Sequence, residues 1–79
     1  MFKVYVIQSA EGYNYTGFSE NFDRRLKEHN SGTQRYTRKG TCWTLIYSED
    51  VPTRAEARKR EKYLKSHAGK EWLKRRGIF

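Results

Sequence analysis

Hydrophobic residues occur in three short runs of strand-forming character, separated by polar segments. The first run covers residues 2–9, the second residues 13–18 and the third residues 43–48. All three are rich in β-branched and aromatic side chains, which favour a pleated, half-buried surface. Gly12 lies between the first two runs, where a tight turn needs a residue that adopts a positive φ. The pattern predicts an antiparallel hairpin followed later in the chain by a third strand.

Between the second and third strands, the apolar spacing changes to that of a helix. Phe22 and Leu26 are four apart and mark the buried stripe of a helix predicted over residues 19–30. Ser19 is its expected N-cap, because a serine hydroxyl accepts a hydrogen bond from the first turn. A glycine-containing stop follows, and residues 31–41 show no periodicity. We therefore expect a polar, basic loop there.

The best-defined helix start in the chain follows the third strand. Thr53 and Glu56 fit a capping box, in which the threonine caps the first turn and the glutamate reaches back. Ala57 and Leu64 are seven apart and mark the inner stripe. The helix is predicted to end near Ser66.

A break over residues 67–69 is expected to separate that helix from a last short helix over residues 70–76, anchored by Trp72 and Leu73. A chain of 79 residues is one domain, and it contains no repeat or linker. The predicted order is β-β-α-β-α-α. This order describes an α+β domain, with a small three-stranded antiparallel sheet and helices packed on it.

Positive charge is concentrated in the C-terminal third of the chain. The formal net charge is +8; residues 53–79 hold ten Lys and Arg against three Asp and Glu, which leaves +7 there and +1 in residues 1–52. Such asymmetry attracts polyanions by counterion release, so nucleic acid is the expected partner. A pair of merely solvated basic helices is the simpler alternative. An anionic membrane surface is the weaker option, because no helix has a strongly apolar face.

Cys42 is the only cysteine, so the chain has no intramolecular disulfide. This favours a reducing compartment, and we expect the protein in the cytoplasm. No histidine or metal-ligand spacing surrounds Cys42, and we interpret it as an ordinary small hydrophobe. The longest apolar run near the N-terminus spans only residues 4–7, so no signal peptide or membrane span is predicted. No obligate protein partner is implied.

Several residues that can carry chemistry are placed close together by this arrangement. Arg25 and His29 are four apart, so they project on one helix face beside the apolar stripe and near the sheet. Tyr5 and Tyr15 are ten apart across a tight turn and share a face of the hairpin if the register allows it. Taken singly, each position has a simpler interpretation as a solvated charge, a boundary histidine or a packing ring.

Glu61 is more unusual, because it lies within the apolar stripe of its helix. It is four residues after Ala57 and three before Leu64. A buried carboxylate is costly unless it is paired or bound to a metal. A salt bridge to Lys65 or Arg58 is the alternative interpretation, since both lie within one helical turn.

Taken together, these residues resemble the GIY-YIG nuclease domain. The first signature corresponds to Lys3-Val4-Tyr5 and the second to Tyr15-Thr16-Gly17, with Gly17 as the motif glycine. Residues 21–32 and 60–66 also match the family, so the resemblance covers essentially the whole chain. It is closest to small stand-alone bacterial proteins similar to the nuclease domain of the excision-repair subunit UvrC, which would associate the chain with DNA repair.

The resemblance implies metal-assisted phosphodiester hydrolysis and a role for each site residue. By analogy, Tyr15 is the general base and Tyr5 assists it or positions the attacking water. Arg25 would hold the scissile phosphate, and His29 would hydrogen-bond within the cluster. Glu61 would bind one divalent metal, Mg²⁺ in the first place and Mn²⁺ as the alternative. A free tyrosine titrates near pH ~10, so the arginine and the metal are expected to lower the pKa of the base.

The predicted function is that of a metal-dependent endonuclease, with DNA as the expected substrate and structure or weak sequence preference as its selectivity. Phe18 stands where some relatives have a lysine, and residues 66–72 contain no counterpart of an asparagine that many relatives carry. A catalytically weak or inactive nucleic-acid-binding module on the same fold is therefore the alternative, followed by a small basic interaction protein. The expected nucleic-acid contacts are Arg35, Arg38, Lys39, Arg58, Lys62 and Lys65.

Overall fold

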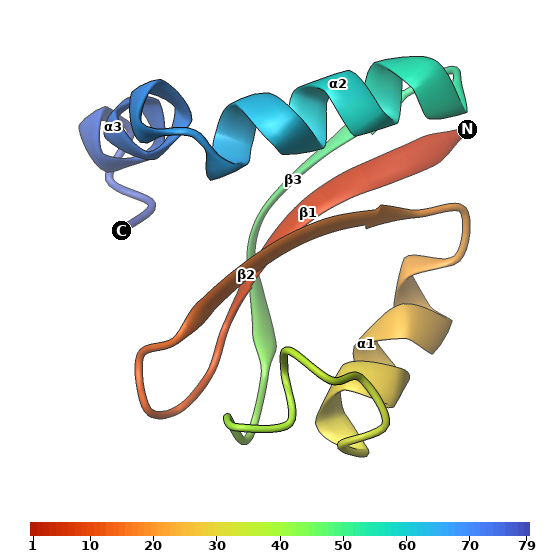
Figure 1. Cartoon of the computed structure of the whole chain (residues 1–79), viewed down its shortest axis with the longest axis vertical. Coiled ribbons are helices and arrows are strands. Elements are labelled where there is room, and N and C mark those ends of the chain that lie inside the picture. The colour runs from red at the N-terminus through yellow and green to blue at the C-terminus, as the bar shows by residue number, and fades with distance from the viewer.

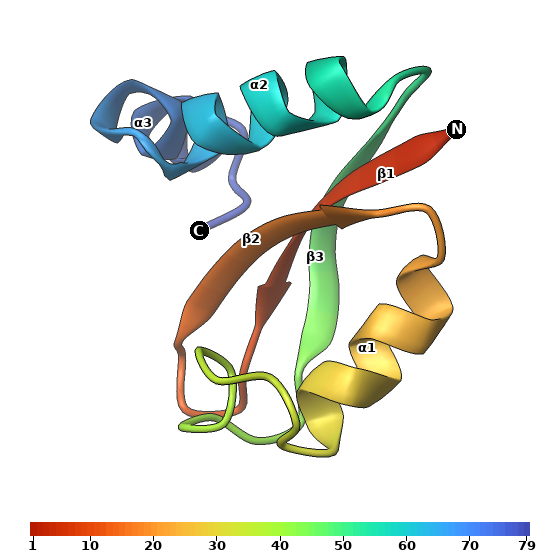
Figure 2. The same cartoon turned by 45° about the vertical axis from the view of Figure 1, so that its right-hand side comes forward.

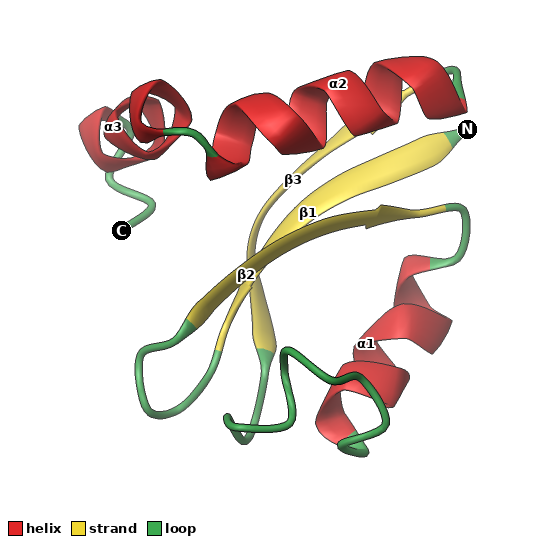
Figure 3. Cartoon of the chain, in the orientation of Figure 1, coloured by secondary structure: helices red, strands yellow, loops and turns green.

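The computed structural model describes residues 1–79 and contains one antiparallel sheet of three strands. The strands are β1 (Phe2–Gln8), β2 (Asn14–Ser19) and β3 (Thr44–Val51). The sheet order is β2-β1-β3, so β1 lies in the centre and pairs on both sides (Figure 3). The predicted hairpin and the third strand are both confirmed.

The three helices cover the sheet from opposite sides (Figures 1 and 2). They are α1 (Phe22–Asn30), α2 (Arg54–Lys65) and α3 (His67–Arg75). The observed order β-β-α-β-α-α and the α+β class agree with the sequence prediction. None of the three is both long enough and apolar enough to cross a membrane.

The first helix begins later than the sequence indicated. Asn21, rather than Ser19, is the N-cap of α1, and its side chain accepts a hydrogen bond from the Arg24 backbone N–H at 3.1 Å. Ser19 is still the last residue of β2, and its hydroxyl accepts from the Asn21 backbone N–H at 3.0 Å. The strand therefore uses the residue that was expected to cap the helix.

The expected break over residues 67–69 is wrong, because α3 already begins at His67. Ser66 alone separates the two helices, as the C-cap of α2 and the N-cap of α3. Gly69 lies inside α3 and is buried; a Cβ there would clash with the backbone of Tyr63 and Leu64. The glycine thus allows close contact between the helices rather than ending one of them.

The third strand is longer than the predicted run. It extends to Val51, which pairs with Phe2, whereas the apolar pattern ended at Ser48. The extension includes Glu49 and Asp50, whose charges do not suggest a strand by composition. Charged residues are common on edge strands, where they oppose pairing with another chain.

Cys42 does not behave as a small buried hydrophobe. It is exposed, and its φ of 53° lies in the left-handed region. The next residue, Trp43, is buried. The chain therefore turns at Cys42 and directs the large ring, not the thiol, into the core.

The domain has two apolar clusters, one on each face of the sheet. The aliphatic cluster contains Val4, Val6, Ala57, Leu64 and Leu73. The aromatic cluster contains Tyr5, Ile7 and Trp43, with Tyr15, Phe22 and Leu26 packed against it. Alternate residues of β1 contribute to the two clusters because successive strand side chains point to opposite faces. Residues 4–7 of β1 are all buried, which explains why they form a continuous apolar run.

Candidate active site

The strand register brings the two predicted tyrosines together. Tyr5 pairs with Gly17 and Ile7 pairs with Tyr15 across the β1–β2 hairpin. The two tyrosines are therefore diagonal neighbours on the face that α1 covers. Their ring centroids are 6.4 Å apart.

Gly17 provides the space that these rings occupy. A Cβ at this position would lie 2.8 Å from the Tyr5 hydroxyl oxygen and 3.0 Å from Cε2 of Tyr15. Any larger residue would have to push one of the phenols away. The requirement for glycine here is therefore steric, as a glycine interrupting a strand often indicates.

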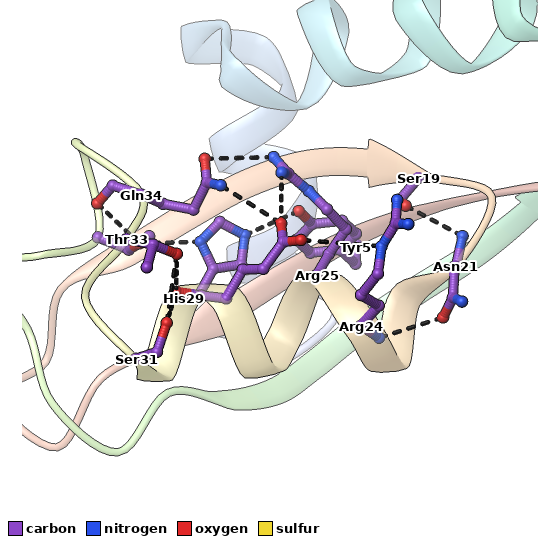
Figure 4. Close-up of polar contacts among 11 residues, drawn as sticks. Tyr5, Ser19, Asn21, Arg24, Arg25, His29, Ser31, Thr33 and Gln34 are labelled. Carbon is purple, nitrogen blue, oxygen red and sulfur yellow. Dashed lines mark hydrogen bonds and ion pairs between the residues drawn. The ribbon is translucent and has the colours of Figure 1, made fainter.

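His29 is buried and links Tyr5 to the loop that follows α1. Its Nε2 lies 2.9 Å from the Tyr5 hydroxyl, and its Nδ1 lies 2.8 Å from the Thr37 hydroxyl (Figure 4). His29 and Thr37 are 1% and 0% exposed. Both ring nitrogens thus have partners inside the protein.

The hydrogen-bond directions in this chain follow from the partners of Thr37. Its hydroxyl donates to the Gln34 backbone carbonyl at 3.4 Å, so it accepts from Nδ1–H of His29. Nε2 then accepts from the Tyr5 hydroxyl. Burial lowers the pKa of His29, Arg25 lowers it further, and Glu28 opposes both. The ring is therefore neutral at pH 7, and its Nε2 can accept the hydrogen bond from the Tyr5 hydroxyl.

Arg25 extends from α1 above this cluster. Its guanidinium donates to Glu28 at 2.8 Å and to the Gln34 side chain at 3.5 Å (Figure 4). Burial lowers the pKa of Arg25, but hydrogen bonds to Tyr5 and Glu28 outweigh burial and raise it overall. A permanently charged, half-buried guanidinium suits a phosphate, which its planar fork can bind through two hydrogen bonds.

The tyrosine pKa values differ from the sequence expectation. Burial raises the pKa of Tyr5 to about 12, with Tyr15 adding to the shift and Arg25 opposing it. Burial also raises the pKa of Tyr15, as does the Glu61 carboxylate, while Arg25 again opposes. The arginine acts in the expected direction, but burial is the larger effect. Both phenols are neutral at pH 7 in the protein alone.

Glu61 lies on α2, on the opposite side of the sheet, and acts on this cluster through its charge. Its side chain is 21% exposed, and its Oε2 lies 3.6 Å from Nζ of Lys65. That ammonium lies 5.6 Å from the centroid of the Tyr15 ring. Because β2 is an edge strand, side chains of α2 can pass around it. The ion pair with Lys65, one of the alternatives from the sequence, is present, and the charge of the Glu61 carboxylate also acts on both tyrosines.

The residues present can hold a metal ion only if the substrate supplies further ligands. No group of three or more His, Cys, Asp or Glu is arranged to hold an ion. Glu61 supplies one carboxylate, whose charge acts on both tyrosines. Mg²⁺ retains several waters and is usually bound by one or two carboxylates together with substrate phosphate oxygens. A single glutamate beside a phosphate site is compatible with that pattern.

The six predicted nucleic-acid contacts are all exposed, and they divide into two groups. Lys65 lies beside the site tyrosine Tyr15, whereas Lys39 lies beside Tyr13, with its Nζ 4.6 Å from the centroid of that ring. Both line a hollow that also contains Tyr15. The other four are exposed side chains of the loop and α2 outside that hollow: Arg35, Arg38, Arg58 and Lys62.

Sequence reasoning missed Thr37, which holds the second nitrogen of His29. A threonine in an aperiodic basic segment gave no signal of burial. The local sequence also did not show that Glu28 would be the ion-pair partner of Arg25, although the two are three apart on α1. That spacing was the available indication.

The fold agrees with the comparison to known families. A family profile described as the GIY-YIG catalytic domain matches residues 1–75. The chain belongs to the GIY-YIG family, which is a family of nuclease domains.

Its relatives are small proteins that share the name UPF0213. One from Halobacterium salinarum is 42% identical over 76 residues, which are 92% of this chain and 99% of the relative. Another, from Desulfotalea psychrophila, is 45% identical over 64 residues; these are 78% of this chain but 58% of the relative, so the chain spans little more than half of that protein. A solution NMR structure of a UPF0213 protein from Bacillus halodurans aligns with a TM-score of 0.55 and 35% identity, covering 92% of this chain and 82% of that one.

Proposed function

We propose that the chain is a metal-dependent endonuclease that hydrolyses phosphodiester bonds of nucleic acid, with DNA as its substrate. The observation that carries the proposal is the meeting of ionisable groups from four elements around the edge strand β2. They are the five polar residues of the predicted site: Tyr5, Tyr15, Arg25, His29 and Glu61. Family membership supports the same class of reaction.

The geometry supports different roles for the two tyrosines. The Tyr5 hydroxyl donates a hydrogen bond to His29 and has a pKa of about 12. Tyr5 therefore keeps its proton, and its role is to hold the residues around it in place. Tyr15 is less buried, and no side chain holds its hydroxyl. We therefore assign Tyr15 as the base that takes a proton from the attacking water. Arg25 binds the scissile phosphate and stabilises the additional negative charge that develops on it.

Glu61 would hold the divalent ion, which when bound supplies a Lewis acid for the phosphate and stabilises the leaving oxygen. In the protein alone, the Glu61 carboxylate raises the pKa of Tyr15. Coordination of an ion by that carboxylate would weaken this effect, while Arg25 lowers the pKa of the phenol in either case. Protonation of Tyr15 is thus coupled to the state of Glu61.

The second candidate function is nucleic-acid binding without efficient hydrolysis. The observation that favours it is the raised pKa of both tyrosines, which keeps the base protonated at pH 7. This candidate uses the same basic surfaces and differs only in the chemical step.

The test is cleavage of labelled branched, bubble and single-stranded DNA in Mg²⁺ or EDTA. We expect metal-dependent cleavage that falls at least about 100-fold in Glu61→Ala and in Arg25→Ala, as for removal of a group that stabilises a transition state. Binding in EDTA should be largely retained in Glu61→Ala. Glu20→Ala and Lys27→Ala are the controls, because both residues are exposed and neither forms an ion pair or a hydrogen bond with a residue of the site.

Full activity in Glu61→Ala would overturn the assignment of the site. Absence of cleavage in the wild-type protein, with binding intact, would support the binding module instead.

A further inference from the structure

A hollow of about 900 Å³ lies between β2, the loop after α1 and helix α3. Figure 1 shows that α3 and the hairpin diverge on this side of the sheet. Because β2 is an edge strand, no further strand covers this side of it. The proposed endonuclease function uses only one lining residue of the hollow as a catalytic group, Tyr15.

The charged lining of the hollow is mostly positive. Four lysines line it, against a single carboxylate. That carboxylate, Glu71, lies 3.9 Å from Lys74 and is therefore already paired. Lys70 and Lys74 are four apart on α3, so they form a row on one helix face. The hollow is complementary to a polyanion such as a phosphate backbone.

The hollow also has exposed aromatic rings, which a simple phosphate-binding surface does not need. Tyr36 is 74% exposed, Tyr13 is 42% exposed and Phe79 is 39% exposed. All three line the hollow. Exposed rings beside lysines are the combination with which proteins bind single-stranded nucleic acid, since every base offers a face for stacking. In a duplex these faces are already stacked on neighbouring bases and cannot reach the rings.

The hollow is continuous with the candidate active site. Tyr15 is part of its lining, and so is Lys65, whose ammonium lies near both the Tyr15 ring and the Glu61 carboxylate. A strand that occupies the hollow would therefore lead directly to the proposed base. Thr41 hydrogen-bonds to Glu11 through its backbone N–H and its hydroxyl, which ties the loop wall to the hairpin turn. The hollow is thus bounded by connected elements.

We propose that this hollow binds an unpaired segment of nucleic acid, whose phosphates contact the lysines and whose bases stack on Tyr13 and Tyr36. The inference rests on the proposed endonuclease function and specifies its substrate class: nucleic acid with a single-stranded arm next to the bond that is cut. The aromatic faces accept any base, so binding here is independent of sequence.

The test measures binding separately from hydrolysis, by fluorescence anisotropy in EDTA. The probes are labelled oligonucleotides of about twelve nucleotides, a length within the range of about 4–16 that small single-strand sites cover. Oligothymidine and oligouridine probe DNA and RNA, and a blunt duplex of the same length is the paired comparison. The variants are Tyr36→Ala and the pair Lys70→Gln with Lys74→Gln. The pair Lys27→Gln with Lys59→Gln removes the same charge from exposed positions outside the hollow.

We expect the single strand to bind more tightly than the duplex. Tyr36→Ala should weaken single-strand binding at least about fivefold, with Tyr36→Phe close to wild type, because the ring and not the hydroxyl makes the contact. The Lys70 and Lys74 pair should reduce the slope of log affinity against log salt by about 1.4, as for two lost phosphate contacts on a single strand.

Equal binding of duplex and single strand, or hollow variants that bind like the Lys27 and Lys59 control, would overturn the proposal. Cleavage of the same oligonucleotides in Mg²⁺ is a separate readout. If binding depends on the hollow and no cleavage occurs, the hollow stands and the hydrolytic function fails. If cleavage occurs but Tyr36→Ala leaves single-strand binding unchanged, the hydrolytic function stands and the hollow fails.

Discussion

The two faces of the sheet bury different kinds of side chain, although the same central strand lines both. The face toward α2 and α3 buries Val4 and Val6 among aliphatic residues. The face toward α1 buries Tyr5, whose hydroxyl is hydrogen-bonded to a histidine that is itself almost fully buried. Aliphatic burial is non-directional, whereas a buried hydrogen bond fixes the distance and orientation of its partners.

Alternate residues of β1 therefore serve two purposes: those on one face stabilise the domain, and those on the other face hold the candidate site. The aliphatic face can tolerate substitutions that keep volume, because its contacts have no required direction. The polar face cannot, because an unsatisfied buried group costs the full penalty of its lost hydration. A slip of one residue in the β1 register would turn each side chain of β1 to the opposite face of the sheet. The aliphatic core and the polar cluster would then be lost together.

The largest loss in the free energy of unfolding is expected from a substitution on the aliphatic face. Leu64→Ala should lower the free energy of unfolding by about 2–5 kcal/mol, because it opens a cavity among side chains that are fully buried. For a domain of 79 residues, whose total stability is on the order of 4–12 kcal/mol, this is a substantial part. Urea denaturation followed by circular dichroism measures it, and Leu64→Met should cost less than about 1.5 kcal/mol. Equal losses in the two variants would contradict the cavity argument.

A smaller effect is expected on the polar face, from a substitution that conserves shape. Thr37→Val keeps the volume but removes the acceptor for Nδ1–H of His29. The buried N–H then lacks a partner, which should cost about 1–3 kcal/mol in the same urea experiment. Thr37→Ser restores the hydroxyl and should recover most of the loss. Valine and serine variants of equal stability would show that the hydrogen bond to His29 does not matter.

The smallest expected effect is a pH dependence of the stability, which comes from His29 on the polar face. The pKa of His29 is lowered in the folded protein, first by burial and then by Arg25, from an ordinary value of 6.5. Below pH 6.5, His29 binds a proton in the unfolded chain but still resists protonation in the folded chain. The contribution of His29 to the free energy of unfolding is therefore complete above pH 6.5 and declines as the pH falls toward the folded pKa. The urea midpoint should therefore fall more between pH 7 and 5 in the wild type than in His29→Gln. An identical fall in both proteins would contradict the assignment.

Much of the fold followed from local patterns in the sequence. The apolar runs gave the strands, and the spacing of Phe22 and Leu26 gave α1. The errors occurred at residue types that are common in two different structural roles. Ser19 is a good cap residue but ends a strand, and Gly69 is a common helix stop but here permits close packing inside α3. Tertiary contacts, which the local sequence does not contain, decide between such uses.

The sequence indicated that the candidate site residues would lie near one another, but it did not indicate their electrostatics. Helical spacing placed Arg25 and His29 on one face, and strand alternation made it possible for the tyrosines to meet. The direction of the tyrosine pKa shifts depends on burial, which exceeds the effect of Arg25. Thr37 and the lysines of α3 gave no individual signal, because their roles depend on which elements the fold brings together.

The central position of β1 also has a consequence for the order of folding. β1 can pair early with β2, its neighbour along the chain, but it must wait for β3, which begins at Thr44. Such long-range pairing requires closure of a large loop and slows folding relative to local contacts. Glu61 comes later still, so a chain that has made only the hairpin and α1 has the tyrosines and Arg25 without the carboxylate. On the proposed function, a growing or half-folded chain is therefore unable to cut nucleic acid, and cleavage begins only when the whole domain has assembled.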